Sequence, residues 1–113
     1  MVAPKKPQDH KPKSLPVKDV AGGKQVTFRG LKIVVKQAAL KDHRVVQGFA
    51  DLQGDVLSEF EKIALNGRLI DRVLGKDQAE SLVNKLADKD GFTDFTVLAA
   101  AFNEIMGAAY PNS

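Results

Sequence analysis

"QVTFRGLKIVVKQ", residues 25–37, is the stretch that decides the fold. Apolar residues alternate with polar ones along it, and they are Val26, Phe28, Leu31, Ile33 and Val35. A period of two, interrupted once at Arg29-Gly30, predicts a β-hairpin with one apolar face. Because two strands alone are only marginally stable in water, that face is expected to pack on helices. The free edge of the hairpin can also accept a further strand.

Beyond Ala38 the apolar period becomes helical, which predicts four or five short helices. The predicted segments are residues 40–53, 55–65, 68–75, 76–88 and 95–110. Short helices gain most of their stability from packing, so these are expected to form one compact bundle. The predicted fold is therefore mainly α, with an N-terminal β-hairpin at 25–37 in a single helical domain over residues 25–113. Regular helical stripes place Phe49, Phe60 and Phe102 in its core.

Aspartates and glycines indicate where the predicted helices begin and end. Asp42 is expected to cap the first long helix, and Gly54-Asp55 to end that helix and cap the next. Asn66-Gly67 is expected to stop that second helix, and Gly75 to end the segment after it. Asp77 starts a pattern similar to a capping box.

Residues 1–24 are expected to form a disordered arm. They hold four of the five prolines and no aromatic residue, and their six lysines stand against two aspartates, a local balance of +4. Too little apolar surface is present to offset the entropy of ordering the backbone. Lys5, Lys6, Lys11 and Lys13 are candidates for weak nucleic-acid contact through phosphates. The arm has no arginine and no aromatic residue to stack on bases, so a solubilising leader is the favoured interpretation.

Enzymatic classes find no support in the sequence, and neither a catalytic residue nor a cofactor is predicted. There is no cysteine, which excludes disulfides, thiolate nucleophiles and zinc sites that need sulfur. The two histidines, His10 and His43, are too few for a histidine-rich metal site, and no serine has a hydrolase motif around it. The longest apolar run, "VLAAAF", is too short to span a membrane. We expect a noncatalytic, soluble protein in the cytoplasm.

"LADKDGFTDF", residues 86–95, looks at first like a cation-binding loop. With Gly91 at the sixth position of a calcium loop, Asp88 and Asp90 occupy positions three and five. Leu86 and Val97 then fall where calcium needs oxygen ligands, so no metal site is predicted. The stretch is instead expected to be a turn, in which Asp88 ends one helix, Asp90-Gly91 turns the chain, and Thr93 or Asp94 caps the last helix.

The remaining candidate for function is the surface. Phe92, Phe95 and Tyr110 lie next to turns or chain ends, which makes them the predicted partner-binding residues.

The order of these features resembles the tail assembly chaperones of long-tailed, siphovirus-type bacteriophages that infect Gram-positive hosts. In that group a hairpin precedes an aspartate-led helix, a Leu-Gly element leads into a helix beginning near a glutamine, and an Asp-x-Asp-Gly turn introduces the last helix. The matching positions are Asp42, Leu74-Gly75, Gln78, Leu82, Leu86, Asp88, Asp90-Gly91 and Asn112-Ser113. The lysine-proline arm and the segment from Val56 to Arg68 depart from that pattern.

The resemblance implies a noncatalytic role in virion assembly. Such proteins coat the hydrophobic tape measure protein and help to recruit tail tube subunits in the host cytoplasm, and they are generally absent from the mature virion. The tape measure protein and the tail tube protein are therefore the implied partners. Two alternatives stay open: a small nucleic-acid-associated protein acting through its basic arm, and a structural component of the tail or head-tail junction.

Overall fold

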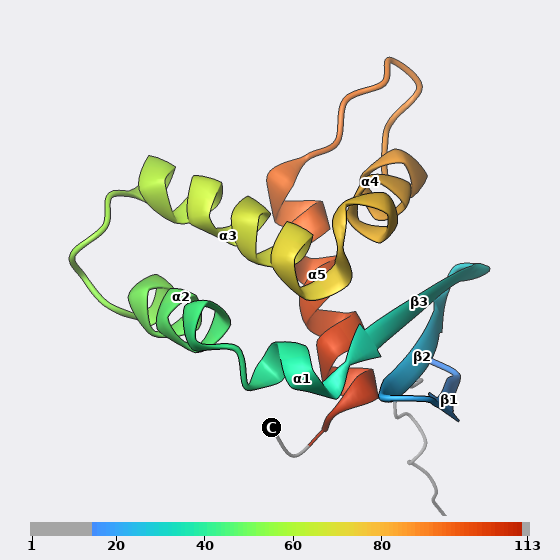
Figure 1. Cartoon of the computed structure of the whole chain (residues 1–113). Helices are drawn as coiled ribbons and strands as arrows, with labels where there is room; N and C mark the ends of the chain where they lie inside the picture. Colours follow the sequence, from blue (N-terminus) through green and yellow to red (C-terminus); the bar gives the residue numbers. More distant parts are fainter. Residues whose placement is uncertain (1–14, 112–113) are drawn as a thin grey trace, which may run out of the picture.

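Three antiparallel strands lead into five helices in the computed structural model, which describes residues 15–111 (Figure 1). The strands are β1 (Val17–Val20), β2 (Gly23–Phe28) and β3 (Leu31–Lys36). The helices are α1 (Gln37–Leu40), α2 (His43–Gln53), α3 (Glu59–Leu74), α4 (Lys76–Lys85) and α5 (Phe95–Ala109). The fold is an α+β domain, so the prediction of a mainly α bundle with a hairpin is wrong.

The third strand, β1, comes from the segment that was predicted to be part of the disordered arm. It pairs with β2 from Val17 opposite Val26 to Val20 opposite Gly23. The first three of its residues are exposed and it forms one edge of the sheet, so it carries no alternating apolar pattern. Backbone hydrogen bonds to β2 stabilise β1, and such bonds cannot be recognised from the amino-acid composition. The rest of the predicted arm, with Lys5, Lys6, Lys11 and Lys13, lies outside the described residues.

The predicted hairpin is present and forms β2 and β3. Phe28 pairs with Leu31 across a two-residue turn in which Arg29 and Gly30 both have positive φ, the turn whose twist matches paired strands. At the other end of the hairpin Gly23 passes close to β3. A Cβ at this position would lie 2.3 Å from the carbonyl oxygen of Val35, so only glycine fits.

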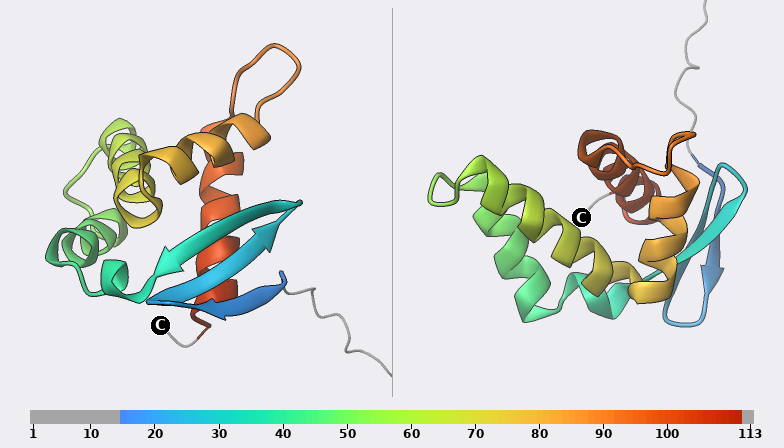
Figure 2. Two further views of the ribbon diagram at one scale, coloured as in Figure 1. Left: turned by 45° about the vertical axis from the view of Figure 1, so that its right-hand side comes forward. Right: turned by 90° about the horizontal axis from the view of Figure 1, so that it is seen from above.

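Helix α5 crosses one face of the sheet, and this contact forms the centre of the core (Figure 2, left). Phe102 and Ile105 of α5 are fully buried, together with the apolar face of the hairpin, Val26, Phe28, Ile33 and Val35. Phe102 also stacks on Phe49 of α2, with ring centroids 6.5 Å apart. Helices α3 and α4 pack beside β3 and complete the core.

The outer edge of β3 is closed by a side chain of α4. The amide of Gln78 accepts a hydrogen bond from the N–H of Val34 at 2.7 Å and donates one to the Val34 carbonyl at 2.9 Å. It also donates to the carbonyl of Leu74, the last residue of α3, at 2.7 Å. One glutamine therefore pairs with the sheet edge as a strand would and ties α3 and α4 to it.

Helix α3 runs without a break through Asn66-Gly67, where a stop was predicted. Ser58 and Glu61 form a full capping box at its start, and its buried residues, Leu69, Ile70, Val73 and Leu74, all lie in its second half. An interior glycine costs a helix about 1 kcal/mol. Packing of the second half and the cap outweigh that cost, so the two predicted segments are one helix.

The caps of the helices agree only in part with the predicted ones. Asp42 caps α2 by accepting from the N–H groups of Arg44 and Val45, and Asp94 caps α5 by accepting from Thr96. Ser58, and not Asp55, caps α3. The cap predicted at Asp77 is wrong, because α4 starts from Gly75 at φ 84° and Asp77 lies inside its first turn with no capping bond.

The loop between α4 and α5 projects beyond both helices (Figure 1). Its Asp88 carboxylate accepts from the N–H groups of Asp90 and Phe92, and the N–H of Asp88 donates to the Phe92 carbonyl. Gly91 supplies the positive φ of 88° that the turn requires. The acidic stretch is thus a self-bonded turn whose first carboxylate is occupied by backbone donors.

Candidate partner-binding groove

Several large apolar side chains lie exposed on the helices and on their connections. Val56, Phe60 and Phe92 are 94%, 84% and 74% exposed, and Phe95 is 52% exposed. The prediction that Phe60 belongs to the core is wrong. The α3 residues that reach the core are half-buried Leu65 and the buried residues from Leu69 onward, so Phe60 in the first turn has no core to enter.

A groove of about 390 Å³ lies between the N-terminal halves of α3 and α5, with the end of α2 at one side. Its lining residues are Leu52, Lys62, Ile63, Asn66, Gly67, Phe95, Leu98 and Ala99. Figure 2 (right) shows the pair of α2 and α3 on one side and α5 on the other. We call this feature the α3–α5 groove.

Both walls of the α3–α5 groove carry apolar side chains, and the local sequence explains where they lie. No charged residue occurs in α5 before Glu104, and Phe95, Leu98 and Ala99 face the groove from its first two turns. On α3, Ile63 and Gly67 lie on one stripe of the helix. Phe60 precedes Ile63 by three residues, so it extends the same stripe by one turn toward the start of α3.

Lys62 is the one charged residue that lines the α3–α5 groove. Its side chain is half-buried. Within residues 15–111 the ion pairs are Lys24 with Asp19 and Arg72 with Asp42, so the Lys62 ammonium has no acidic partner there. Lysines at the border of an apolar surface generally pack the aliphatic stem on that surface and keep the charge in water.

The floor of the groove is open at Gly67. A Cβ placed there would meet nothing within 4 Å, and Gly67 has an ordinary helical φ. The fold therefore does not need glycine at this position, although glycine costs the helix about 1 kcal/mol relative to alanine. Because Gly67 has no side chain, free space remains between α3 and α5.

The three residues predicted to bind a partner do not form one patch. Phe95 lines the α3–α5 groove and Phe92 is exposed on the α4–α5 loop. Tyr110 is half-buried at the end of α5, where its hydroxyl donates to the carbonyl of Val35 at 2.9 Å. Sequence reasoning missed Ile63 and Lys62 as groove residues, and it missed the exposure of Phe60 next to the groove. Phe60 and Ile63 share an apolar helical stripe, which the sequence analysis assigns to the core.

Another hollow, of about 620 Å³, lies where α1, α3, α4 and β3 meet, and three of its polar side chains already have partners within the fold. Arg72 forms a two-point ion pair with Asp42, at 3.1 and 2.8 Å, and Gln78 is bound to β3 as described above. The hydrogen bond from Arg72 lowers the pKa of Asp42 to about 2. With these groups satisfied internally, this hollow is a structural corner of the fold.

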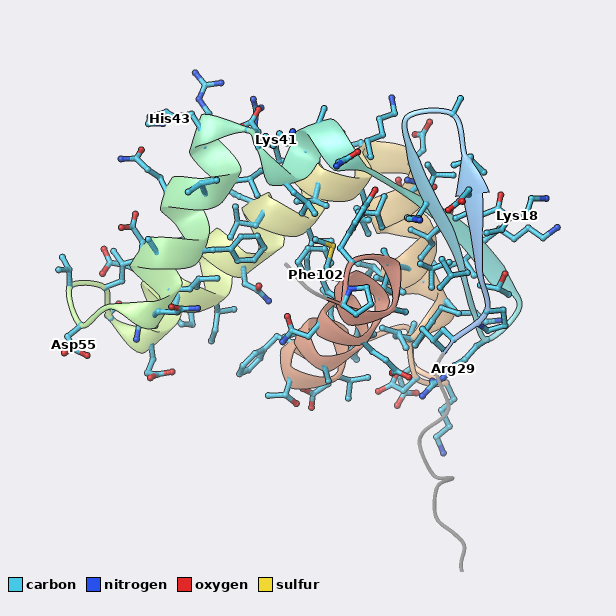
Figure 3. The ribbon with its side chains drawn as sticks, turned by 90° about the horizontal axis from the view of Figure 1, so that it is seen from below. Lys18, Arg29, Lys41, His43, Asp55 and Phe102 are labelled. Atoms are coloured by element: carbon cyan, nitrogen blue, oxygen red, sulfur yellow. The ribbon has the colours of Figure 1, made fainter. Side chains whose placement is uncertain are left out.

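The described residues contain neither a cluster of three metal-ligating side chains nor a helix with the length and apolarity needed to cross a membrane. Figure 3 shows Asp55 at one end of the molecule and Lys18 and Arg29 near the other. The 13 basic and 13 acidic residues of positions 15–111 balance each other.

Comparisons with known protein families, characterised proteins and solved structures found no match.

Proposed function

We propose that this chain is a noncatalytic phage tail assembly chaperone that binds the tape measure protein through the α3–α5 groove and helps to recruit tail tube subunits. It acts in the host cytoplasm and leaves before the virion is complete. Two observations support the proposal. One is the resemblance in the order and spacing of motifs over residues 25–113. The other is the groove itself, and it is this apolar surface that carries the argument.

Tape measure proteins consist of long amphipathic helices whose apolar stripes need cover before assembly. A surface that offers apolar walls and no enclosed pocket fits repeated weak binding along such a helix. Phe60 and Phe95 are exposed. Burying a phenylalanine side chain stabilises a protein by roughly 1.5–3 kcal/mol, so their exposure does not contribute to the stability of the monomer. Large aromatic side chains are also enriched among the residues that dominate binding energy.

The proposal is tested by coexpressing the chain with a tape measure protein of a siphovirus-type phage. We expect the tape measure protein to move from the pellet to the supernatant and to copurify with a tag on this chain. The double variant Phe60→Ser with Phe95→Ser is expected to lose both effects. Val46→Ser is the matched control, because Val46 is 53% exposed on α2 outside the groove. A tape measure protein that stays insoluble and does not copurify would refute the proposal.

Mass spectrometry of purified particles distinguishes a chaperone from a retained tail component. The proposal expects the tail tube and tape measure proteins in the particle and this chain absent from it. Stoichiometric recovery of this chain in finished tails would assign it a structural role instead.

A further inference from the structure

We infer that the α3–α5 groove receives a single α-helix of the partner, and that this helix carries an acidic residue beside its apolar stripe, placed to pair with Lys62. The inference deepens the proposed function and rests on it for the identity of the partner. The form of the occupant and its charge are argued from the groove alone.

The groove selects a helix over an extended strand. Its walls are helices, whose backbone N–H and C=O groups are bonded within each helix away from the ends. An extended segment in the groove would therefore bury backbone groups that find no partner there, which is costly. A helix satisfies its own backbone and offers only side chains. A third helix can pack its side chains into the open groove between two helices.

Small residues set how deeply the occupant can sit. Gly67 on α3 and Ala99 on α5 line the groove, and the space above Gly67 is open. Large residues, Ile63, Leu98 and Phe95, stand beside these small ones. An apolar side chain of the incoming helix fits above Gly67, while its neighbours one turn away meet the large residues.

The charge of the occupant follows from Lys62. It is the one charged lining residue, it is half-buried, and no acidic group of residues 15–111 pairs with it. An incoming helix removes water from the side chain and leaves its ammonium against the edge of the apolar stripe. A basic residue on that edge would repel it, and an acidic residue would pair with it. Complementary charge thus fixes which helices bind and in which register.

Designed helical peptides of about 20 residues provide the probe. Each carries a leucine stripe at i, i+3, i+4 and i+7, and the residue flanking the stripe is Glu in one peptide and Lys in its partner. Fluorescence anisotropy with the full chain measures Kd. We expect the Glu peptide to bind about three- to tenfold more tightly, with the difference shrinking as salt rises. In Lys62→Glu the preference is expected to reverse.

A second variant fills the groove without touching its charge. Gly67→Leu is expected to weaken binding of the Glu peptide at least tenfold while melting no lower than the parent chain, because the new side chain meets open space and improves the helix. Gly107→Leu is the matched control. Gly107 is also a helix glycine with nothing within 4 Å of a Cβ, but it lines a different hollow, beside Phe49 and Met106. It is expected to bind like the parent.

Each contrary result overturns the inference. These are equal binding of both peptides, unchanged binding by Gly67→Leu, loss of binding in Gly107→Leu alone, or self-association of the parent chain that Gly67→Leu abolishes without any peptide binding. The last result would make a second copy the occupant. Failure of the proposed function can be distinguished from failure of this inference. If the peptides bind as expected but the coexpressed tape measure protein stays insoluble, only the chaperone role is refuted. If Gly67→Leu keeps the tape measure protein as soluble as the parent chain does, only the role of the groove is refuted.

Discussion

Replacement of Gln78 by glutamate tests the closure of the β3 edge. The substitution keeps the size of the side chain and its acceptor oxygen, so the bond from the Val34 N–H survives. It removes the two donated bonds, to the carbonyls of Val34 and Leu74. In their place a carboxylate oxygen faces two carbonyl oxygens at hydrogen-bond distance, where no proton lies between them.

The magnitude follows from those two bonds. Each contributes about 0.5–1.5 kcal/mol net, and the carbonyls left without a donor are part-buried, so Gln78→Glu is expected to lower the free energy of unfolding by about 2–3 kcal/mol at pH 7. For a domain of this size that loss corresponds to a fall of about 10–20 °C in Tm. Most surface substitutions stay within about 0.5 kcal/mol of the parent.

The loss is also expected to depend on pH. Once protonated, the introduced carboxyl can donate to one carbonyl, so the folded state raises the pKa of this group above its unfolded value of about 4.3. A raised pKa means that the folded state binds more protons than the unfolded state. The variant should therefore recover part of its lost stability, relative to the parent, as pH falls from 7 toward 5.

Urea unfolding followed by circular dichroism at pH 7 and pH 5 measures both effects. Gln47→Glu is the matched control, because Gln47 is exposed on α2 and makes no side-chain hydrogen bond within the described residues. It should stay within about 0.5 kcal/mol of the parent at both pH values. A Gln78→Glu variant as stable as this control would show that the amide does not hold the edge of β3.

Three further substitutions test other parts of the fold. Gly23→Ala forces a Cβ against the Val35 carbonyl and is expected to lower the free energy of unfolding, measured with urea, by about 1–3 kcal/mol. An unchanged free energy of unfolding would mean that β2 and β3 are farther apart at Gly23 than described. Asp42→Asn keeps the helix cap and removes the ion pair with Arg72. The pKa of Asp42 lies at about 2, so the stabilisation of the folded state by its ionised carboxylate is complete above pH 4 and is lost as pH falls through 2. Acid unfolding of the Asp42→Asn variant should lack this loss of stability. Identical acid unfolding curves for the variant and the parent would exclude the ion pair. Tyr110→Phe removes the bond to β3 and should cost about 0.5–1.5 kcal/mol, and a variant that instead lost partner binding with unchanged stability would restore Tyr110 to the binding surface.

The sequence predicted the elements whose signal is local. Alternation marked β2 and β3, and short polar side chains at helix starts predicted caps at Asp42 and at Thr93 or Asp94, of which Asp94 caps α5. It failed where the stabilising groups are distant in sequence or are backbone groups. β1 is held by pairing to β2, and α3 continues through Asn66-Gly67 because residues from Leu69 onward are buried.

The candidate site was missed for a related reason. A helical apolar stripe shows which face is apolar, but not how far along the helix the core extends. Phe60 and Ile63 share the stripe of α3, yet the buried part of this helix begins only at Leu69. Phe95 was found because its position beside a turn indicated exposure. No local pattern indicated that Gln78 binds the edge of β3, since its partner Val34 is 44 residues away.

The two edges of the sheet differ in a way that limits how the chain can polymerise. β3 has its Val34 groups occupied by Gln78, while β1 forms the other edge and no strand of the described residues lies beyond it. If two copies met edge to edge through β1, each would present only its occupied β3 edge to a third copy. Because Gln78 occupies Val34 at the middle of that edge, addition of a third copy there is disfavoured, and such a contact is expected to close at two copies. The sheet therefore has one edge, β1, that is more open to strand addition than the other.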